Sequence, residues 1–269
     1  MPFAYFIWDP HPGMFDFQIP LLHRPILWYG FFFALGFLMG YRVLLQLLKR
    51  HFHRESRQLA ELLTFYVLVG AVVGARLGDV LFYQDWRQVV QHPLSIVAIW
   101  EGGLASHGGA VGILVALWLL SKKRKLSFWT LLDFTVIPAS LGAVCIRIGN
   151  FFNQEILGTP SDLPWAVLFL HPADGSALVP RHPVQLYESL GYLLAFGVLL
   201  LYWRKHKGPL QGRLSGLFLM LVFGLRFFLE WVKLEQSVYL SQGGWLTMGQ
   251  WLSLPFFLLG AYLFFRKRD

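Results

Sequence analysis

Apolar runs close to twenty residues long recur along this chain and constrain its fold more than any other feature. A run of that length crosses about 30 Å of hydrocarbon as an α-helix that rises ~1.5 Å per residue. We expect seven spans, near residues 27–48, 61–83, 94–120, 128–151, 184–203, 213–233 and 246–265. Because 56% of the residues are hydrophobic and only 14% are charged, an ordinary soluble domain is excluded. The sequence predicts an all-α integral membrane protein, a seven-transmembrane helix bundle that forms a single polytopic domain over residues 1–269.

Basic residues gather at the ends of alternate spans and predict the orientation. Fifteen of the 23 lysines and arginines follow spans one, three, five and seven. They are Lys49, Arg50, Arg54, Arg57, Lys122, Lys123, Arg124, Lys125, Arg204, Lys205, Lys207, Arg213, Arg266, Lys267 and Arg268. The positive-inside rule makes that side cytoplasmic, with the N-terminus extracytoplasmic and the C-terminus cytoplasmic. The net charge of +8 is thereby explained without a nucleic-acid partner.

Two segments outside the spans are expected on the outer side. Residues 1–26 carry Asp9 and Asp16, lack a basic start and a small-residue cleavage site, and are rich in aromatic residues. We therefore expect an interfacial segment and not a cleavable signal peptide. The long connection over residues 152–183 predicts a small extracytoplasmic cap, since a loop of this length in a compact chain is usually functional.

Disulfide and metal chemistry are not expected. The chain has one cysteine, Cys145, within an apolar run, where a thiol is usually a small buried hydrophobic group. No histidine pattern has the spacing of metal ligands, so the sequence predicts neither a metal nor a cofactor.

Polar residues at the end of the fourth span indicate a functional site. The stretch from Ile146 to Gly158 carries Arg147, Asn150, Asn153 and Glu155. A charged side chain at membrane depth costs roughly 2.5–3.5 kcal/mol on insertion scales and therefore usually has a function. The alternative is a helix end whose polar residues only cap the helix and meet the lipid headgroups.

Three arginines in separate spans, Arg76, Arg147 and Arg226, could together form a phosphate-binding cavity, because a guanidinium matches phosphate oxygens and stays charged. Arg76 lies three residues before Asp79, and Arg226 lies four before Glu230. Each of those pairs shares a helix face and could simply neutralise itself. Arg147 has no acid within four residues, which makes it the strongest candidate to hold an anion.

His107 lies in a glycine-rich part of the third span, between Gly102-Gly103 and Gly108-Gly109. An imidazole with an ordinary pKa near ~6.5 is a natural proton acceptor, although a lone histidine in a span is often only a hydrogen-bonded core residue.

Tyr29 and Tyr187 stand at the outer ends of spans one and five. Each could bind a lipid headgroup or serve as an interfacial anchor.

Residue chemistry alone leaves three classes of function open. The first is an enzyme that acts on an anionic lipid. The second is a transporter or flippase for anionic lipids or small anions, with the arginines along its pathway. The third is a purely structural membrane subunit, in which the unpaired Arg147 would have no functional role.

The pattern Arg-x-Gly-Asn-Phe-x-Asn-x-Glu-x-x-Gly over 147–158 resembles the signature of bacterial prolipoprotein diacylglyceryl transferases. The resemblance covers essentially the whole chain. It also includes Trp28-Tyr29-Gly30, Gly74-Ala75-Arg76, Gly102-Gly103 through Ser106-His107-Gly108-Gly109, Arg181-His182-Pro183 through Gln185-Leu186-Tyr187-Glu188, Gly224-Leu225-Arg226 with Glu230, and Met248-Gly249-Gln250 before Pro255.

The resemblance implies an enzyme of the bacterial inner membrane that catalyses the first step of lipoprotein maturation. It would transfer a diacylglyceryl group from phosphatidylglycerol to the lipobox cysteine of a prolipoprotein signal peptide. A thioether would form and glycerol phosphate would leave. The positions that match the family's important residues are Tyr29, His107, Arg147, Asn150, Glu155, Gly158, Arg226 and Glu230.

The chain departs from the family pattern in two places. Val222 and Phe223 stand where relatives often have a tyrosine, so neither residue there supplies a hydroxyl. The stretch after Glu230 lacks the common Arg-x-Pro-Asp ending.

The chemistry of a thiol nucleophile suggests a mechanism. A free thiol has a pKa near ~8.5, and the thiolate is the species that attacks. In this hypothesis Arg147 and Arg226 hold the phosphodiester and His107 is the base. Glu155 and Glu230 orient the arginines, and Asn150 contacts a substrate oxygen.

Overall fold

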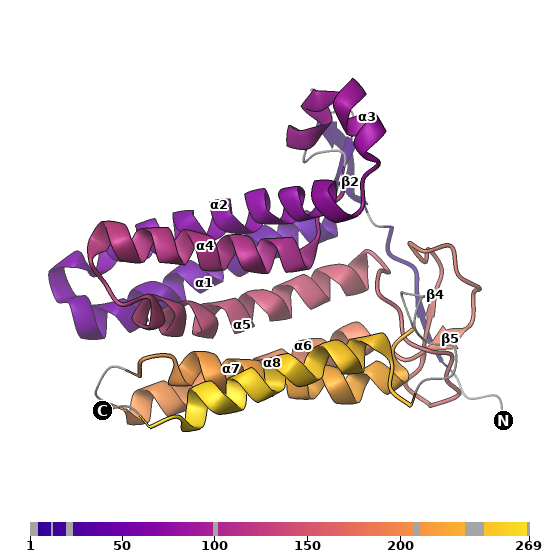
Figure 1. Cartoon of the computed structure of the whole chain (residues 1–269). Helices are drawn as coiled ribbons and strands as arrows, with labels where there is room; N and C mark the ends of the chain where they lie inside the picture. Colours follow the sequence, from indigo (N-terminus) through magenta and orange to yellow (C-terminus); the bar gives the residue numbers. More distant parts are fainter. Residues whose placement is uncertain are drawn as a thin grey trace. The chain divides into compact units, whose positions relative to one another are not determined.

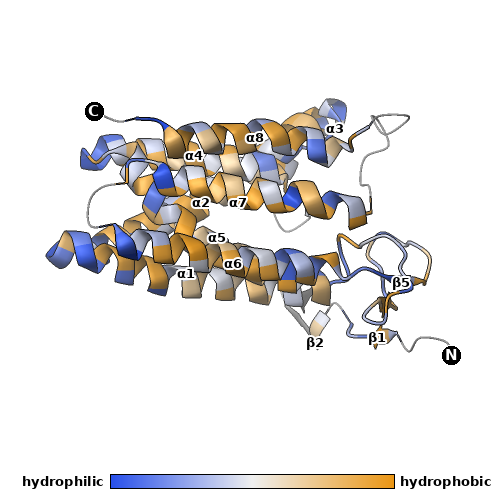
Figure 2. Cartoon of the chain, turned by 90° about the horizontal axis from the view of Figure 1, so that it is seen from below, coloured by the Kyte–Doolittle hydropathy of each residue, from blue (hydrophilic) through white to orange (hydrophobic). Residues whose placement is uncertain are grey.

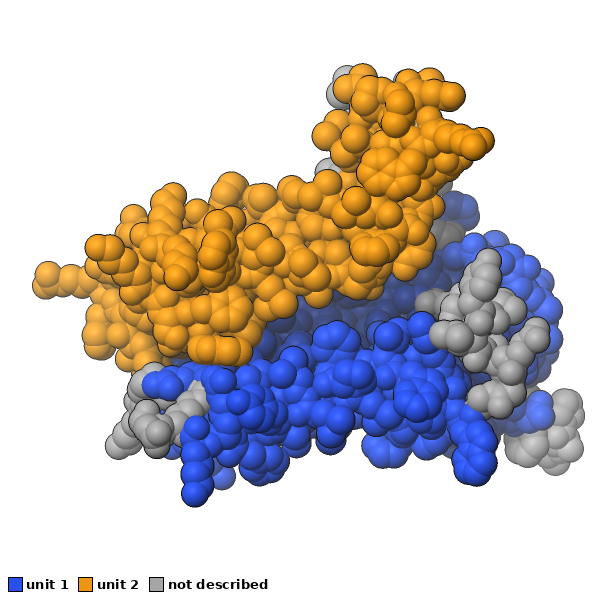
Figure 3. Space-filling model, viewed as in Figure 1, with its two compact units in different colours: residues 1–40, 136–269 blue, residues 41–135 orange. Residues whose placement is uncertain are grey.

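The computed structural model describes residues 5–11, 13–19, 24–98, 102–206, 210–234 and 245–267. Contacts within the chain divide it into two units (Figure 3). Unit 1 comprises residues 1–40 and 136–269, and unit 2 comprises residues 41–135.

Long helices occupy every predicted span (Figure 1). In the described ranges they are α1 (Trp28–Phe52), α2 (Ser56–Phe82), α4 (Ser106–Arg124), α5 (Phe128–Phe152), α6 (Val184–Lys205), α7 (Arg213–Leu229) and α8 (Met248–Phe265). Hydrophobic residues cover most of their length, and hydrophilic residues gather toward their ends (Figure 2). The helical integral membrane class is therefore confirmed.

Five stretches of the described residues are long and apolar enough to cross a membrane. They are Trp28–Phe82, which contains both α1 and α2, then Phe128–Phe152, Val184–Lys205, Arg213–Val232 and Met248–Phe265. Helix α4 is not among them. Its 19 residues begin with Ser106 and His107 and end with three basic residues, which leaves a shorter apolar stretch.

The third helix begins later than the sequence predicted. The expected span started near residue 94, whereas α4 starts at Ser106. Short helical segments, α3 (Trp86–Gln91) and η2 (Pro93–Val97), precede it. Gly102 and Gly103 then have φ angles of +90° and +71°, a left-handed conformation that favours glycine and interrupts an α-helix. The glycines break the helix that the apolar pattern predicted.

Within unit 2, helices α2 and α4 pack with their backbones in contact. A Cβ atom added to Gly70 would lie 2.6 Å from the carbonyl oxygen of Gly112, and one added to Gly74 would overlap the carbonyl of Gly108. Small residues allow such close packing where no hydrophobic force drives two membrane helices together. Unit 2 is thereby built around a glycine-lined helix pair.

Within unit 1, α7 and α8 approach in the same way. A Cβ atom on Gly216 would lie 2.7 Å from the carbonyl oxygen of Gly260. Helix α8 starts at a capping box, in which the Thr247 hydroxyl accepts from the Gln250 backbone amide and the Gln250 side chain accepts from the Thr247 amide. The cap fixes the start of α8.

Unit 1 also contains strands that the sequence analysis did not predict. Strands β1 (Phe6–Trp8), β4 (Val167–Phe169) and β5 (Pro180–Arg181) form a sheet in the order β1-β4-β5, with β1 parallel to β4. Strand β2 (Gly13–Ile19) pairs with β3 (Arg24–Leu27). The predicted cap segment therefore shares a small sheet with the N-terminal segment.

The sheet is joined to the end of α5 by an apolar cluster. Phe151, Leu157, Val167 and Phe169 are buried together. Trp8 packs on this cluster, and its indole Nε1 donates a 3.0 Å hydrogen bond to the carbonyl of Phe151. This packing holds the turn after α5 in place, and that turn carries the candidate site.

Candidate functional site

The turn after α5 folds Glu155 back onto the end of the helix. Gln154 and Ile156 have φ angles of +55° and +57°, which reverse the chain on both sides of Glu155. Both carboxylate oxygens of Glu155 then accept hydrogen bonds, one from Asn150 Nδ2 at 2.8 Å and one from Asn153 Nδ2 at 3.0 Å. The two asparagines predicted from the sequence are thus fixed by the predicted glutamate.

Arg147 lies one turn before these asparagines and is paired with a residue of another helix. Its Nε atom lies 2.7 Å from the Glu188 carboxylate of α6, and its Nη1 atom donates to Asn150 Oδ1 at 3.0 Å. The phenol of Tyr192, one turn after Glu188, interacts with the same guanidinium. The nearest carboxylate to Arg147 therefore comes from a distant part of the sequence.

Glu188 also binds Lys233. The Nζ atom of Lys233, just after η4 (Glu230–Val232), lies 3.4 Å from the second Glu188 oxygen. The pKa of the Lys233 ammonium is lowered, mainly because the group is buried. The Glu188 carboxylate acts in the opposite direction and raises this pKa, whereas the positive charges of Arg147 and Arg226 lower it further. A carboxylate whose side chain is 2% exposed thus joins two cations.

The chain after α7 is held against the turn after α5. Gly158 and Lys233 form an antiparallel bridge. The Thr159 amide donates to the Val232 carbonyl at 2.9 Å, and the Leu234 amide donates to the Leu157 carbonyl at 3.0 Å. These bonds place the ammonium of Lys233 beside Glu188.

Arg226 of α7 belongs to the same cluster. Tyr192 and Lys233 each interact electrostatically with both Arg147 and Arg226. Among the described residues, no ion pair joins Arg226 to Glu230, so the self-pairing that the sequence left open as an alternative is not observed. Buried Arg226 Nε and Glu230 Oε2 have no hydrogen-bond partner in the described part of the chain.

The carboxylate of Glu230 lies directly over the backbone of Gly249 in α8. A Cβ atom at Gly249 would overlap this carboxylate. Glycine at the start of α8 therefore makes room for the acidic group of Glu230, the first residue of η4, which directly follows α7. The family motif contained Gly249, although the sequence analysis gave this residue no role.

Tyr29 lies beside the Glu155 network. Its backbone amide donates to Asn153 Oδ1 at 3.3 Å, and its phenol interacts electrostatically with Glu155 and Arg147. The first turn of α1 thus joins the end of α5.

Gly158 and Tyr187 contact residues outside the cluster around Arg147. A Cβ atom at Gly158 would lie 2.7 Å from Val184 Cγ2, so glycine permits the close approach of this turn to the start of α6. The Tyr187 hydroxyl accepts from Trp165 Nε1 at 2.8 Å and lies 3.4 Å from His182 Nδ1. These contacts give both residues a part in the local packing.

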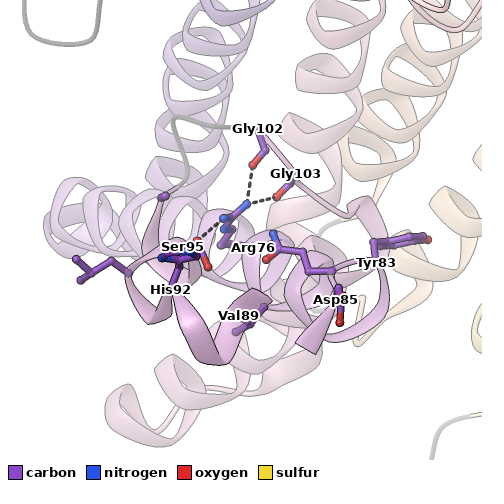
Figure 4. A pocket seen from close by; sticks show the side chains of 11 residues that line it. Arg76, Tyr83, Asp85, Val89, His92, Ser95, Gly102 and Gly103 are labelled. Carbon is purple, nitrogen blue, oxygen red and sulfur yellow. Dashed lines mark hydrogen bonds between the residues drawn. The ribbon is translucent and has the colours of Figure 1, made fainter. Parts of the chain in front are cut away.

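Arg76, in unit 2, is surrounded by backbone carbonyls (Figure 4). Its donors bind the carbonyls of Ser95, Ile96, Gly102 and Gly103, and its Nη1 atom lies 3.5 Å from Asp79 Oδ2. The pairing with Asp79 that the sequence left open as an alternative is present, but carbonyl groups provide most of the contacts.

His107 is the second residue of α4, also in unit 2. Its ring centroid lies 5.3 Å from that of Phe82 and 5.8 Å from that of Tyr83. The side chain is exposed, which argues against a buried core histidine.

Several residues of the network were missed or left without a role by sequence reasoning. Glu188 was part of a family motif, and a charge near the start of a span could have marked it as functional. Lys233, at the end of the predicted span 213–233, carried the same kind of signal. Tyr192 did not, because only the fold brings its phenol to Arg147. Over the described ranges, no group of three or more histidine, cysteine or acidic side chains is placed to hold a metal ion.

The fold and the site define a helical membrane protein with a buried cluster of cations and carboxylates at the end of its helices. The family model of prolipoprotein diacylglyceryl transferase matches residues 17–266. The chain therefore belongs to the prolipoprotein diacylglyceryl transferase family.

Individual relatives agree with the family match. The chain is 43% identical over 268 residues to the phosphatidylglycerol–prolipoprotein diacylglyceryl transferase of Chloroherpeton thalassium, covering 98% of this chain and 95% of that protein. The protein of the same name from Tolumonas auensis is 46% identical over 257 residues, 95% of each chain. The one from Protochlamydia amoebophila is 49% identical over 217 residues, which are 78% of this chain and 58% of that relative's length.

Proposed function

We propose that this protein is a phosphatidylglycerol–prolipoprotein diacylglyceryl transferase, an enzyme of lipoprotein maturation. The names of its relatives give the reaction. The observation that carries the proposal is the cluster of Arg147, Arg226 and Lys233 around Glu188 and Tyr192. These three cations outnumber the two carboxylates that act on Lys233, those of Glu188 and Glu230, and the remaining positive charge favours a bound anion.

The phosphodiester of phosphatidylglycerol is the anion that this cluster would hold. Glu188 and Asn150 fix the Arg147 guanidinium from two sides, and this support holds the group in place before substrate arrives. Arg226 contributes a buried Nε–H that lacks a protein acceptor among the described residues. A phosphate oxygen is a suitable acceptor for such a donor.

Glu230 is suited to bind the glycerol of the headgroup. Its buried Oε2 atom has no donor in the described part of the chain, and a glycerol hydroxyl can supply one. This role replaces the expected orientation of Arg226 by Glu230. Glu155 supports Arg147 through Asn150, to which both are hydrogen-bonded.

In the reaction, the thiolate of the lipobox cysteine attacks the diacylglyceryl carbon that carries the phosphate ester. A sulfur–carbon bond forms, and the carbon–oxygen bond to phosphate breaks. Glycerol phosphate leaves with the bonding electrons, and the arginines stabilise the charge that develops on it. The thiol proton passes to a base, for which His107 is our candidate.

We propose that all seven long helices cross the bacterial inner membrane. The last turns of α1, α4 and α6 carry basic residues, which the positive-inside rule assigns to the cytoplasm. The N-terminus is then extracytoplasmic and the C-terminus cytoplasmic. Residues 152–183 form an outer cap, and residues 1–26 lie at the interface.

A transfer assay tests this function. The full chain in detergent is incubated with phosphatidylglycerol, radiolabelled in its acyl chains, and a peptide that contains a lipobox cysteine. We expect label on the peptide through a base-stable thioether and release of glycerol phosphate. If lipid crosses proteoliposome membranes while no thioether forms, the protein is a transporter or flippase and the proposal fails.

A further inference from the structure

The buried guanidinium of Arg76 connects α2 to two segments of the loop that precedes α4. Nε donates to the carbonyl of Ile96 at 3.1 Å, and Nη2 donates to that of Ser95. On the other side, Nη1 donates to the carbonyls of Gly102 and Gly103 at 2.6 and 3.1 Å (Figure 4). With 5% of its surface exposed, Arg76 has its nitrogen atoms directed at the protein backbone.

The loop is shaped to receive this side chain. Gly103 has a φ of +71°, and a Cβ atom there would lie 2.9 Å from Arg76 Nη1 and overlap the Asp79 carboxylate. Asp79 is held in turn by Gln84 Nε2 at 2.7 Å. Both the backbone conformation and the available space therefore call for glycine at this position.

The same loop leads directly into the start of α4. The Ala105 amide donates to the Ala75 carbonyl, the residue before Arg76, at 3.0 Å. His107 follows two residues later, with its ring against Phe82 and Tyr83 at the end of α2. The contacts of Arg76 thus fix the segment from which His107 projects.

A cavity of about 740 Å³ lies beside this arrangement. Arg76, Ser95, Gly102 and Gly103 line it together with Tyr83. Because Tyr83 also contacts His107, loss of the guanidinium would disturb both the cavity wall and the surroundings of the histidine.

We infer that Arg76 is a positioning residue that sets the place of His107 by holding the backbone of Ser95, Ile96, Gly102 and Gly103 on α2. It does not bind the substrate phosphate, because its donors are already directed at four carbonyl groups. Buried charges in membrane proteins are commonly satisfied in this way, and the planar fork of arginine can reach several acceptors at once. The inference rests on the proposed function of His107 as base.

Steady-state kinetics of the full chain separate positioning from binding. We expect Arg76→Lys to lower kcat by about tenfold or more while KM for phosphatidylglycerol changes less than about twofold, since small displacements of catalytic groups cost up to ~10²-fold. The pH profile of kcat should change as well. Arg57→Lys on the exposed face of α2 is the matched control and should retain the rate of the unsubstituted protein.

Gly103→Ala tests the same contact without removing a charge. Its Cβ atom would displace Arg76, so Gly103→Ala should also lower kcat at a nearly constant KM, and it provides the test if Arg76→Lys fails to fold. Gly102→Ala has similar backbone strain but no atom within 4 Å of its Cβ, and it should lower kcat less.

Two results would overturn the inference. A rise of KM for phosphatidylglycerol at constant kcat would show that Arg76 binds the phosphate. Full activity of His107→Gln would leave nothing for Arg76 to position. Failure of the proposed function is distinct from both, because then the unsubstituted protein would form no thioether.

Discussion

The guanidinium of Arg147 lies 2.7 Å from the carboxylate of Glu188, and the two residues come from different helices of unit 1. The second oxygen of Glu188 lies 3.4 Å from Lys233. One buried carboxylate thus holds two cations whose positive field remains only partly neutralised. This arrangement stabilises a buried arginine and leaves positive charge for the anionic lipid headgroup that we propose it binds.

Removal of Glu188 should destabilise the protein. Glu188→Gln leaves Arg147 and Lys233 buried without their carboxylate, and breaking a buried pair costs about 3–5 kcal/mol. Reversible unfolding in detergent measures the effect. Glu61→Gln, which breaks the exposed pair with Arg57, is the control and should change the free energy of unfolding by less than ~1 kcal/mol. Equal stability of the two variants would contradict the structural role of Glu188.

Lys233 should make activity sensitive to alkaline pH. Because burial lowers the pKa of its ammonium, Lys233 loses its charge at a lower pH than an ordinary lysine. We expect kcat/KM for phosphatidylglycerol to fall as the pH rises through that pKa. Lys233→Arg keeps the charge and should move the decline to higher pH. Identical alkaline profiles for the two proteins would exclude Lys233 from the anion site.

Gly249→Ala should impair the binding of phosphatidylglycerol. The added Cβ atom would overlap the Glu230 carboxylate and displace the group that we assign to the glycerol. KM for phosphatidylglycerol should rise by about tenfold or more, the loss expected for one hydrogen bond to a charged group. Gly197→Ala in α6, where no atom lies within 4 Å of the added Cβ, should leave KM unchanged. An unaltered KM for Gly249→Ala would argue against the role of Glu230.

Cys145→Ser should retain turnover. Cys145 is 4% exposed, and the nucleophile of the proposed reaction arrives on the lipoprotein precursor. No acyl-enzyme intermediate is expected. The rate of transfer onto a lipobox peptide checks this expectation. If turnover is lost while the variant still folds, a covalent role of the enzyme's own cysteine must be considered.

The helices could be predicted because the length and polarity of an apolar run are local properties. The start of α4 could not, since Gly102 and Gly103 interrupt a run that remains apolar in composition. The small sheet was also missed. Strands β1 and β4 have three residues each, too few to show an alternating pattern.

The site was predictable only in part. Arg147, Asn150 and Glu155 are neighbours in sequence, so their common location could be inferred from one motif. Their connection to Glu188 and Lys233 depends on α6 and on the chain after α7, and no local pattern reports it. For the same reason the sequence could not show that Arg76 binds carbonyl groups, whereas its pairing with Asp79, three residues away, was one of the two alternatives that the sequence offered.

The most direct test of the phosphate-binding cluster is single-turnover transfer from phosphatidylglycerol to a lipobox peptide by Arg147→Ala and Arg226→Ala. Each removes a cation that we propose stabilises the departing glycerol phosphate. The account predicts a loss of about 10²-fold or more for each variant, the cost of removing one preorganised donor from a site of developing charge. A folded Arg147→Ala protein that transfers at the full rate would contradict it.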